Sequence, residues 1–111
     1  MVLLKSYILK DFCGEDYELY PVKMEYLNNG RLAVMLVETE DEWFCDLTVN
    51  IDYPQSKDND KTLAFVDMPN NPWLKEYLRV HQLAEPTGYY GLSGYNVYPE
   101  YRFNLSKLNE N

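Results

Sequence analysis

The sequence holds few side chains that could act as a nucleophile or a general base. Its single histidine, His81, has no serine, cysteine or carboxylate at a spacing known from hydrolases. Ser93 lies in Gly91-Leu92-Ser93-Gly94, which lacks the G-x-S-x-G spacing of a nucleophile elbow and precedes no helical pattern. We therefore expect no catalytic residue, and we interpret His81 as a helix-terminal side chain that interacts with the last carbonyl groups of its helix.

Metal and cofactor sites are equally poorly supported. Hard cations take six or more oxygen ligands from a regularly spaced loop, and the acidic run Glu38-Thr39-Glu40-Asp41-Glu42 lacks that spacing. One histidine and two distant cysteines, Cys13 and Cys45, cannot supply a usual zinc ligand set. The glycines at 88, 91 and 94 could cradle a phosphate through their N–H groups, but no G-K-[ST] follows them. We expect no metal and no cofactor.

Charge is distributed unevenly along the chain. The 111 residues carry a net charge of -8. Residues 1–60 hold five Lys/Arg against 13 Asp/Glu, and residues 61–111 hold five of each. Direct nucleic-acid binding is not expected, because it depends on neutralising phosphates. The acidic half can serve solubility alone, attract a basic protein partner, or imitate the charge of a nucleic acid.

Cysteine usage and hydropathy indicate where the protein works. Two cysteines make no disulfide framework, and the first ten residues do not form a signal peptide. No apolar run reaches the 18 residues of a membrane-spanning helix. We expect a cytoplasmic protein that does not bind a membrane.

The elements of the first half are predicted to be strands. Residues 17–26 alternate, with Tyr20, Val22, Met24 and Tyr26 on one face and Leu19, Pro21, Lys23 and Glu25 on the other. Pro21 indicates an edge strand or a bulge. Asn29-Gly30 predicts a type I′ hairpin turn, and residues 32–37 are apolar on both faces, as in a covered central strand. Residues 43–51 alternate cleanly, which places Trp43 on the core face beside Cys45. These three strands predict an antiparallel meander, followed by a polar connection over residues 52–61.

The second half mixes strand, helix and loop patterns. Residues 63–66 predict a short buried strand, and Asn71-Pro72 predicts the N-cap and first position of a helix that ends near Leu83 and seats Trp73 in the core. Three glycines between residues 87 and 95 predict a loop, and residues 98–105 predict a last strand. We expect residues 1–111 to form a single α+β domain, a small antiparallel sheet of about five strands with one helix, in which residues 1–16 and 106–111 are loosely ordered.

Several segments together resemble one known family. They are Leu47-Thr48-Val49-Asn50, Ala64-Phe65-Val66-Asp67, Asn70-Asn71-Pro72-Trp73, Pro86-Thr87-Gly88 with Gly91 and Ser93-Gly94, and Tyr98-Pro99-Glu100-Tyr101 with Phe103-Asn104-Leu105. Over residues 28–108 the chain resembles family 4313 of the domains of unknown function, which is carried on conjugative and other mobile elements of bacteria. The resemblance implies an accessory role on such an element and transfers no catalytic residue or ligand.

These observations favour a non-enzymatic binding or regulatory module that acts through a protein partner. The side chains expected to form its interaction surface are acidic or aromatic, namely Glu38, Glu40, Asp41, Glu42, Tyr89, Tyr90 and Tyr95. An acidic face that imitates nucleic-acid charge to block a host defence protein is one alternative. A structural homodimer built from an edge strand or the tyrosine surface is another, and an enzyme is not expected.

Overall fold

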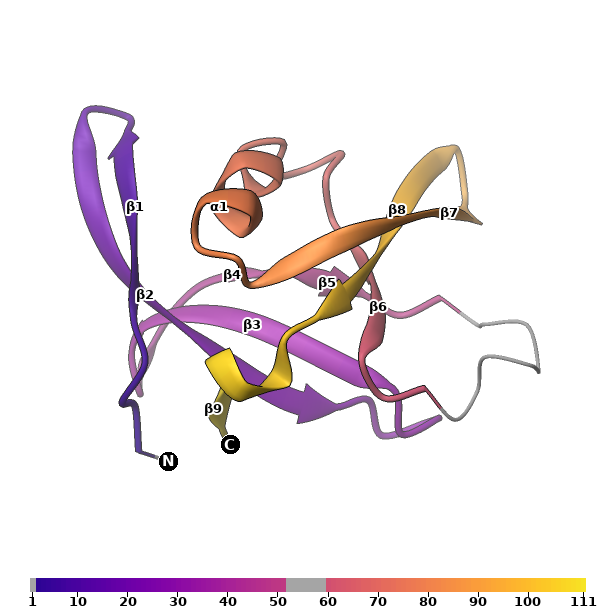
Figure 1. Cartoon of the computed structure of the whole chain (residues 1–111), viewed down its shortest axis with the longest axis horizontal. Helices are drawn as coiled ribbons and strands as arrows, with labels where there is room; N and C mark the ends of the chain where they lie inside the picture. The colour runs from indigo at the N-terminus through magenta and orange to yellow at the C-terminus, as the bar shows by residue number, and fades with distance from the viewer. Residues whose placement is uncertain (1, 52–59) are drawn as a thin grey trace.

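Strands of two sheets make up most of the computed structural model, which describes residues 2–51 and 60–111 (Figure 1). The first sheet has the order β1-β2-β3-β4 with β9 beside β2, and the second has the order β5-β6-β8-β7. The strands are β1 (Tyr7–Phe12), β2 (Glu15–Glu25), β3 (Leu32–Thr39), β4 (Glu42–Asp46), β5 (Thr48–Val49), β6 (Leu63–Val66), β7 (Ala84–Ser93), β8 (Asn96–Phe103) and β9 (Asn109–Glu110). One helix, α1 (Leu74–Val80), and a 3-10 turn, η2 (Leu105–Lys107), complete the described residues.

The predicted α+β class and the antiparallel meander β2-β3-β4 are confirmed, and the structure adds a second sheet to the first. The predicted polar connection of residues 52–61 lies mostly outside the described residues. The chain passes between the sheets at Leu47, whose N–H donates to the Val34 carbonyl and whose carbonyl accepts from Asp67 N–H, each at 2.9 Å. Leu47 is fully buried, so the crossing point is itself part of the core.

The main core lies between the two sheets and α1. The inward face of the first sheet contributes Leu19, Val34 and Leu36. The helix contributes Leu74 and Leu78, and the second sheet adds further buried residues, namely Ala64, Val66, Tyr101 and Phe103. A smaller cluster of Leu63, Phe65 and Tyr98 covers the opposite face of the second sheet. A seven-residue helix is too short to be stable alone, so this packing must hold α1 in place.

Strand β2 lies inside the first sheet, because it changes partners halfway along its length. Residues 17–19 pair with β1, and residues 22 and 23 pair with β9 in parallel, while β3 lies on the other side of residues 20–25. Pro21, which has no N–H to donate, lies between the two pairings. The side chain of buried Asn109 bonds there in place of a strand residue: Nδ2 donates to the Pro21 and Lys5 carbonyls, each at 2.8 Å, and Oδ1 accepts from Leu4 and Lys5 N–H.

Both chain ends differ from their expected loose ordering. Residues 7–12 are paired as β1, and the last residues pair as β9 after η2, with Leu108 and Asn109 buried. The sequence gives little sign that the last residues are ordered, because β9 has only two residues. Its position depends on side-chain hydrogen bonds from Asn109 to residues more than 80 positions away. Pairing across the sheet therefore orders both termini.

Trp43 faces away from the core, contrary to the sequence prediction. Cys45 pairs with Leu36 and Trp43 pairs with Val37, so β4 carries one extra residue, Phe44, at a β-bulge. The bulge turns Phe44 toward the core and Trp43 to the outside, where 61% of Trp43 is exposed. The sequence does not reveal the bulge, because Trp43, Phe44 and Cys45 are all apolar and any of them could face the core.

The turn between β2 and β3 and the start of α1 also differ from expectation. Among the turn residues only Gly30 has a positive φ, 69°, so the turn is a longer loop closed by Tyr26 and Arg31 and not a type I′ turn. The helix begins at Leu74, and no side chain caps it; the Asn71 carbonyl, not its side chain, accepts from Leu74 N–H at 3.0 Å. A preceding 3-10-type turn therefore takes the place of the predicted Asn71 cap.

The helix ends before the predicted Leu83. Gln82 adopts φ 54°, and the Leu83 N–H bonds the Leu78 carbonyl at 3.0 Å, an arrangement in which glycine usually takes the positive φ. Trp73 is half-buried and not fully in the core. Its ring meets those of Phe12 and Phe44 edge-on, with centroids 5.5 and 6.0 Å apart, and so joins α1 to the tips of β1 and β4.

The segment predicted as a glycine-rich loop is strand β7. Its turn to β8 has two residues, Gly94 with φ 62° and Tyr95, which fits a type II′ turn that matches the twist of the strands. Gly91 is needed for a different reason, since a Cβ there would lie 2.8 Å from a ring carbon of Phe65. These glycines are compatible with a hairpin, because Gly94 adopts the positive φ of the turn and Gly91 leaves space for the Phe65 ring.

We expect Asn109→Ala to lower the free energy of unfolding by about 2–4 kcal/mol, because it leaves part-buried N–H and carbonyl groups without partners. Urea unfolding monitored by circular dichroism measures this change. Asn104→Ala, in the same tail but exposed, is the matched control and should stay within about 0.5 kcal/mol of wild type. Equal stability of the two variants would contradict the bridging role of Asn109.

We expect Gly91→Ala to destabilise by about 1–3 kcal/mol, because the added methyl group overlaps the Phe65 ring. The cost should shrink when Phe65 is changed to Leu, since the smaller side chain leaves space at that point. A double-mutant cycle on unfolding free energies tests the coupling. Additive effects would show that the two residues do not interact.

Candidate functional site

The residues predicted to form the interaction surface fall into two separate places. Glu40 and Asp41 form the turn between β3 and β4, with Glu38 and Glu42 in the adjoining strands, whereas Tyr89, Tyr90 and Tyr95 belong to the β7–β8 hairpin. In Figure 1, whose horizontal direction is the longest axis of the 40 × 28 × 22 Å molecule, the acidic turn lies at the left and the hairpin tip at the upper right. The structure therefore presents two surfaces, not one.

The first surface is the outward face of the first sheet. Tyr20, Val37 and Trp43 form one row across β2, β3 and β4, and Val22, Met35 and Asp46 form the next. Val22 and Val37 are buried, Tyr20 and Met35 are half-buried, and Trp43 is mostly exposed. The Trp43 indole Nε1 donates to Asp46 Oδ1 at 3.1 Å, which sets the orientation of the ring. This outer Trp43 face thus exposes the Trp43 ring together with parts of Tyr20 and Met35, over two buried valines.

Acidic side chains surround the outer Trp43 face. Residues 32–51 contain five Asp/Glu and no Lys or Arg. A hollow of about 530 Å³ lies at its Tyr20 end, between the N-terminal residues Val2 and Leu3 and the acidic turn. Its acidic lining residues are three of the predicted four, Glu38, Glu40 and Asp41. Sequence reasoning missed Trp43 and Tyr20 as surface residues, because their alternation is that of an ordinary buried strand face.

The second surface is the β7–β8 hairpin. Besides the three predicted tyrosines it exposes Leu92 and Val97, which face each other across the ladder. Residues 86–99 contain no charged side chain. The alternation of Tyr90, Leu92 and the residues opposite them was the signal that could have identified a strand, but the glycines at 88, 91 and 94 obscured it.

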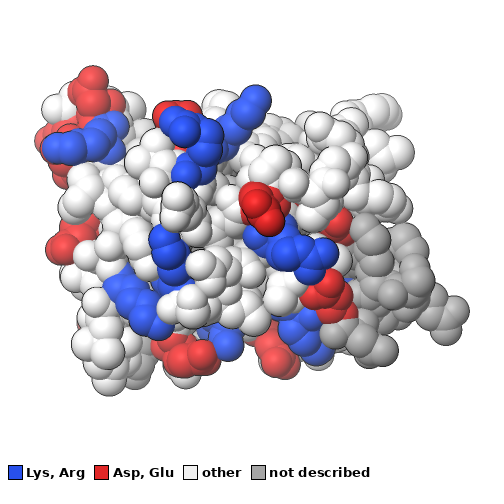
Figure 2. Space-filling view, in the orientation of Figure 1, with Lys and Arg blue, Asp and Glu red and all other residues white. Residues whose placement is uncertain are grey.

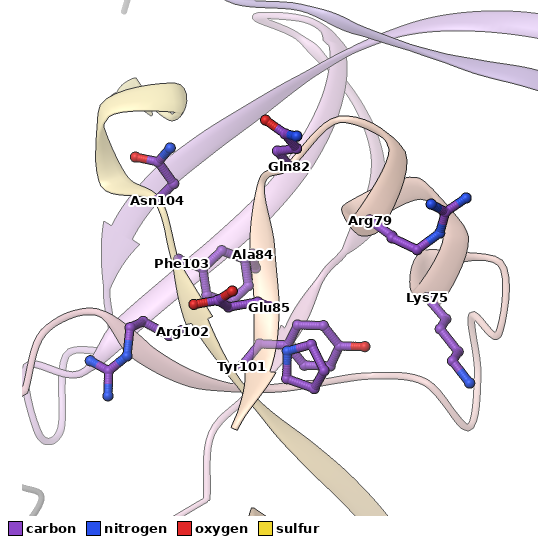
Figure 3. A pocket seen from close by; sticks show the side chains of 10 residues that line it. Lys75, Arg79, Gln82, Ala84, Glu85, Tyr101, Arg102, Phe103 and Asn104 are labelled. Atoms are coloured by element: carbon purple, nitrogen blue, oxygen red, sulfur yellow. The ribbon is translucent and has the colours of Figure 1, made fainter. Parts of the chain in front are cut away.

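A hollow of about 650 Å³ lies between α1 and β7 (Figure 3). Lys75, Arg79 and Arg102 stand around it, and Glu85 and Tyr101 line it. Arg79 pairs with Glu76 and Arg102 pairs with Asp60, and Figure 2 shows both signs of charge interspersed on this face. The lining includes no histidine, cysteine or serine, and its ionisable side chains are Lys75, Arg79, Glu85, Tyr101 and Arg102.

His81 serves the packing of α1 against β1. Its Nε2 lies 2.8 Å from the Ile8 carbonyl oxygen, and its ring meets those of Tyr7 and Tyr77 at 5.5 and 4.9 Å. The neighbouring Tyr77 hydroxyl donates to the Tyr7 carbonyl at 2.7 Å, and burial raises the Tyr77 pKa above its usual range. The imidazole therefore bonds a carbonyl group of β1. The sequence had instead predicted a bond to the last carbonyls of its own helix.

Metal ligands do not gather among residues 2–51 and 60–111, where no three His, Cys, Asp or Glu side chains form a group that could hold an ion. Ser93, the residue of the weak elbow motif, closes the β7–β8 turn. Both cysteines are free, Cys13 exposed and Cys45 buried. Burial, with the nearby Asp46 and Asp67 carboxylates, raises the pKa of Cys45 to about 12.

We expect a thiol reagent such as DTNB to modify one cysteine per folded chain at pH 8. Cys13 is exposed, whereas Cys45 stays protonated and covered and should react only after unfolding in denaturant. Cys13→Ser should remove the fast reaction, and Cys45→Ala should leave it intact. Rapid modification of Cys45 in the folded Cys13→Ser variant would contradict its position in the core.

Comparisons with known proteins identify a family for this chain. Within the described residues, no helix has the length and apolar character needed to cross a membrane. No curated protein and no solved structure matches the chain. One family model, described as a domain of unknown function (DUF4313), matches residues 21–111, which include the end of β2 from Pro21 on, strands β3 to β9 and the helix. Because the match covers well over half of the sequence, the chain belongs to the DUF4313 family.

Proposed function

We propose that this chain is a non-enzymatic binding module that acts through a basic protein partner, which it engages with the outer Trp43 face. The observation that carries the proposal is the exposure of Trp43 within an acidic surround. Tryptophan is among the residues enriched at the energetic centres of protein interfaces. Trp43 is 61% exposed, and an indole combines a large apolar area with a polar N–H, which suits a protein interface.

The charges beside Trp43 select the kind of partner. Asp46 bonds the indole, Glu42 precedes it in β4, and Glu40 and Asp41 lie in the adjoining turn. Residues 32–51 contribute five Asp/Glu and no Lys or Arg to the sheet and its turn. A partner segment with an apolar side chain flanked by Lys or Arg would cover the exposed Trp43 ring. Its cations would then lie against the carboxylates of Asp46 and the β3–β4 turn. Nucleic acid, being an anion, is disfavoured on this face.

A non-enzymatic role is supported by how the reactive side chains are used. His81 is engaged with the Ile8 carbonyl and two tyrosine rings, and Cys45 is buried with a pKa of about 12. Two arginines that line the groove between α1 and β7, Arg79 and Arg102, are each paired with a carboxylate. Packing thus engages His81 and Cys45, and ion pairing engages these two arginines.

The resemblance implies a setting for this role, an accessory function on a bacterial mobile element. The free cysteines are compatible with a reducing cytoplasm. If the partner is a host DNA-binding or defence protein, the acidic face would act by imitating the charge of nucleic acid. That version differs only in the identity of the partner and requires the same residues.

We expect Trp43→Ala to weaken partner binding by about 30-fold or more, which corresponds to about 2 kcal/mol for an interfacial tryptophan. Affinity capture from a natural host with wild-type and variant baits identifies the partner, and calorimetry with the purified partner measures the affinity. Changing Glu38, Glu40, Asp41 and Glu42 to Gln or Asn should weaken binding and reduce its dependence on salt.

Leu27→Ala is the matched control, because Leu27 is fully exposed in the β2–β3 loop and outside the outer Trp43 face. Its binding should equal that of wild type. A captured partner whose affinity survives both the Trp43 and the acidic substitutions, or is insensitive to salt, would refute the proposal.

A further inference from the structure

Strand β7 is the terminal strand of the second sheet, and among the described residues it pairs only with β8. A terminal strand presents N–H and C=O groups that can pair with another strand. Pro86 and the irregular stretch between Pro86 and Tyr90 interrupt the first part of β7, where Thr87 Oγ1 bonds Glu100 Oε1 at 2.7 Å. The regular and accessible part of this edge is therefore short, Tyr90 to Ser93.

The hairpin geometry determines which backbone groups face outward. Ser93 and Asn96 close a two-residue turn, so their N–H and C=O groups face each other. Orientation alternates along an antiparallel ladder, so the groups of Gly91 also face β8, whereas those of Leu92 and Tyr90 face away. Pro99, which has no N–H, lies opposite Tyr90, as this alternation requires.

Electrostatics favours a second copy of the chain as the occupant of this edge. Copies with a net charge of -8 repel each other, but residues 86–99 are uncharged. The hairpin and the acidic turn lie at opposite ends of the 40 Å axis (Figure 1). Two copies that meet at their hairpins would keep their acidic ends far beyond the ~8 Å over which charges interact at physiological salt.

The exposed apolar surface is of a suitable size for self-association. A tyrosine carries about 150–250 Å² of surface. With exposed fractions of 42%, 60% and 106%, Tyr89, Tyr90 and Tyr95 together offer roughly 300–500 Å². Leu92 and Val97 are at least half exposed and extend the patch. Because a standard interface buries about 800 Å² per partner, this patch fits a weak dimer whose formation depends on concentration.

We propose that two copies of this chain pair their β7 strands antiparallel about a two-fold axis at Gly91. Tyr90 of each copy lies opposite Leu92 of the other, so the outward N–H and C=O groups of both residues bond across the interface. The Tyr90 ring packs on Leu92 of the second copy, an aromatic–aliphatic cross-strand pair. Moving the two-fold axis to Tyr90 would bring the irregular stretch before Tyr90 into the new ladder. Moving it to Leu92 would bring in the turn residue Gly94, so the axis at Gly91 is the register that we propose.

Such a dimer is isologous and joins the two four-stranded sheets into one continuous sheet. It leaves the outer Trp43 face of both copies exposed at the far ends. The inference is independent of the proposed function, because dimerisation is measured without any partner, and loss of one activity need not affect the other.

Light scattering coupled to size-exclusion chromatography over a range of concentrations, up to millimolar, tests the dimer. We expect the apparent mass of wild type to rise from 13.2 kDa toward twice that value as concentration rises. Leu92→Lys, which introduces like charges beside the axis, should remain at the monomer mass throughout. Leu92→Pro should also remain monomeric, because it removes an outward N–H that the β7–β8 ladder does not use.

Leu27→Lys is the matched control, an equally charged substitution of an exposed leucine outside the hairpin, and it should dimerise as wild type does. Circular dichroism melts of each variant establish that the fold is retained. If Leu92→Pro unfolds the hairpin, Tyr90→Lys, which keeps the backbone donor, replaces it. A wild-type chain that is monomeric at all concentrations, or a dimer that persists in the folded Leu92 or Tyr90 variants, would overturn the proposal.

Discussion

The carboxamide of Asn109 holds together three segments that are far apart in the sequence. Its oxygen accepts from the N–H groups of Leu4 and Lys5, and its nitrogen donates to the carbonyls of Lys5 and Pro21. The first sheet needs such a bridge, because β2 changes partner from β1 to β9 at a proline that can donate no hydrogen bond. Without it, part-buried backbone groups of the N-terminal segment would be left without partners.

The position of β1 in turn decides where the helix docks. The Tyr77 hydroxyl donates to the Tyr7 carbonyl, His81 bonds the Ile8 carbonyl, and Trp73 packs against Phe12. A seven-residue helix depends on such tertiary contacts for its stability. His81 and the Tyr77 hydroxyl are thereby both used to hold α1 against β1. This use of both groups in packing supports the binding role that we propose.

The two surfaces differ in chemistry and lie at opposite ends of the long axis. One is a Trp-centred sheet face with an acidic rim, and the other is an uncharged hairpin edge rich in tyrosine. In the two proposals made above, their separation would let a chain of net charge -8 self-associate at one end and attract a cationic partner at the other. Pairing through the hairpins would display two Trp43 faces per assembly, which raises the apparent affinity for a partner with repeated sites.

Sequence alone determined the α+β class, the β2-β3-β4 meander, the covered strand β3, the short buried strand β6 and the existence of one helix. Each depends on a local apolar period or on turn residues. Tertiary structure alone decided that Trp43 faces outward, that the glycine-rich segment is a strand, and that both termini are paired. A bulge cannot be located within the apolar run Trp43-Phe44-Cys45, a glycine can be demanded by a neighbouring ring, and a two-residue strand is held by contacts across the sheet. These causes act between residues far apart in the chain, so local pattern carries no record of them.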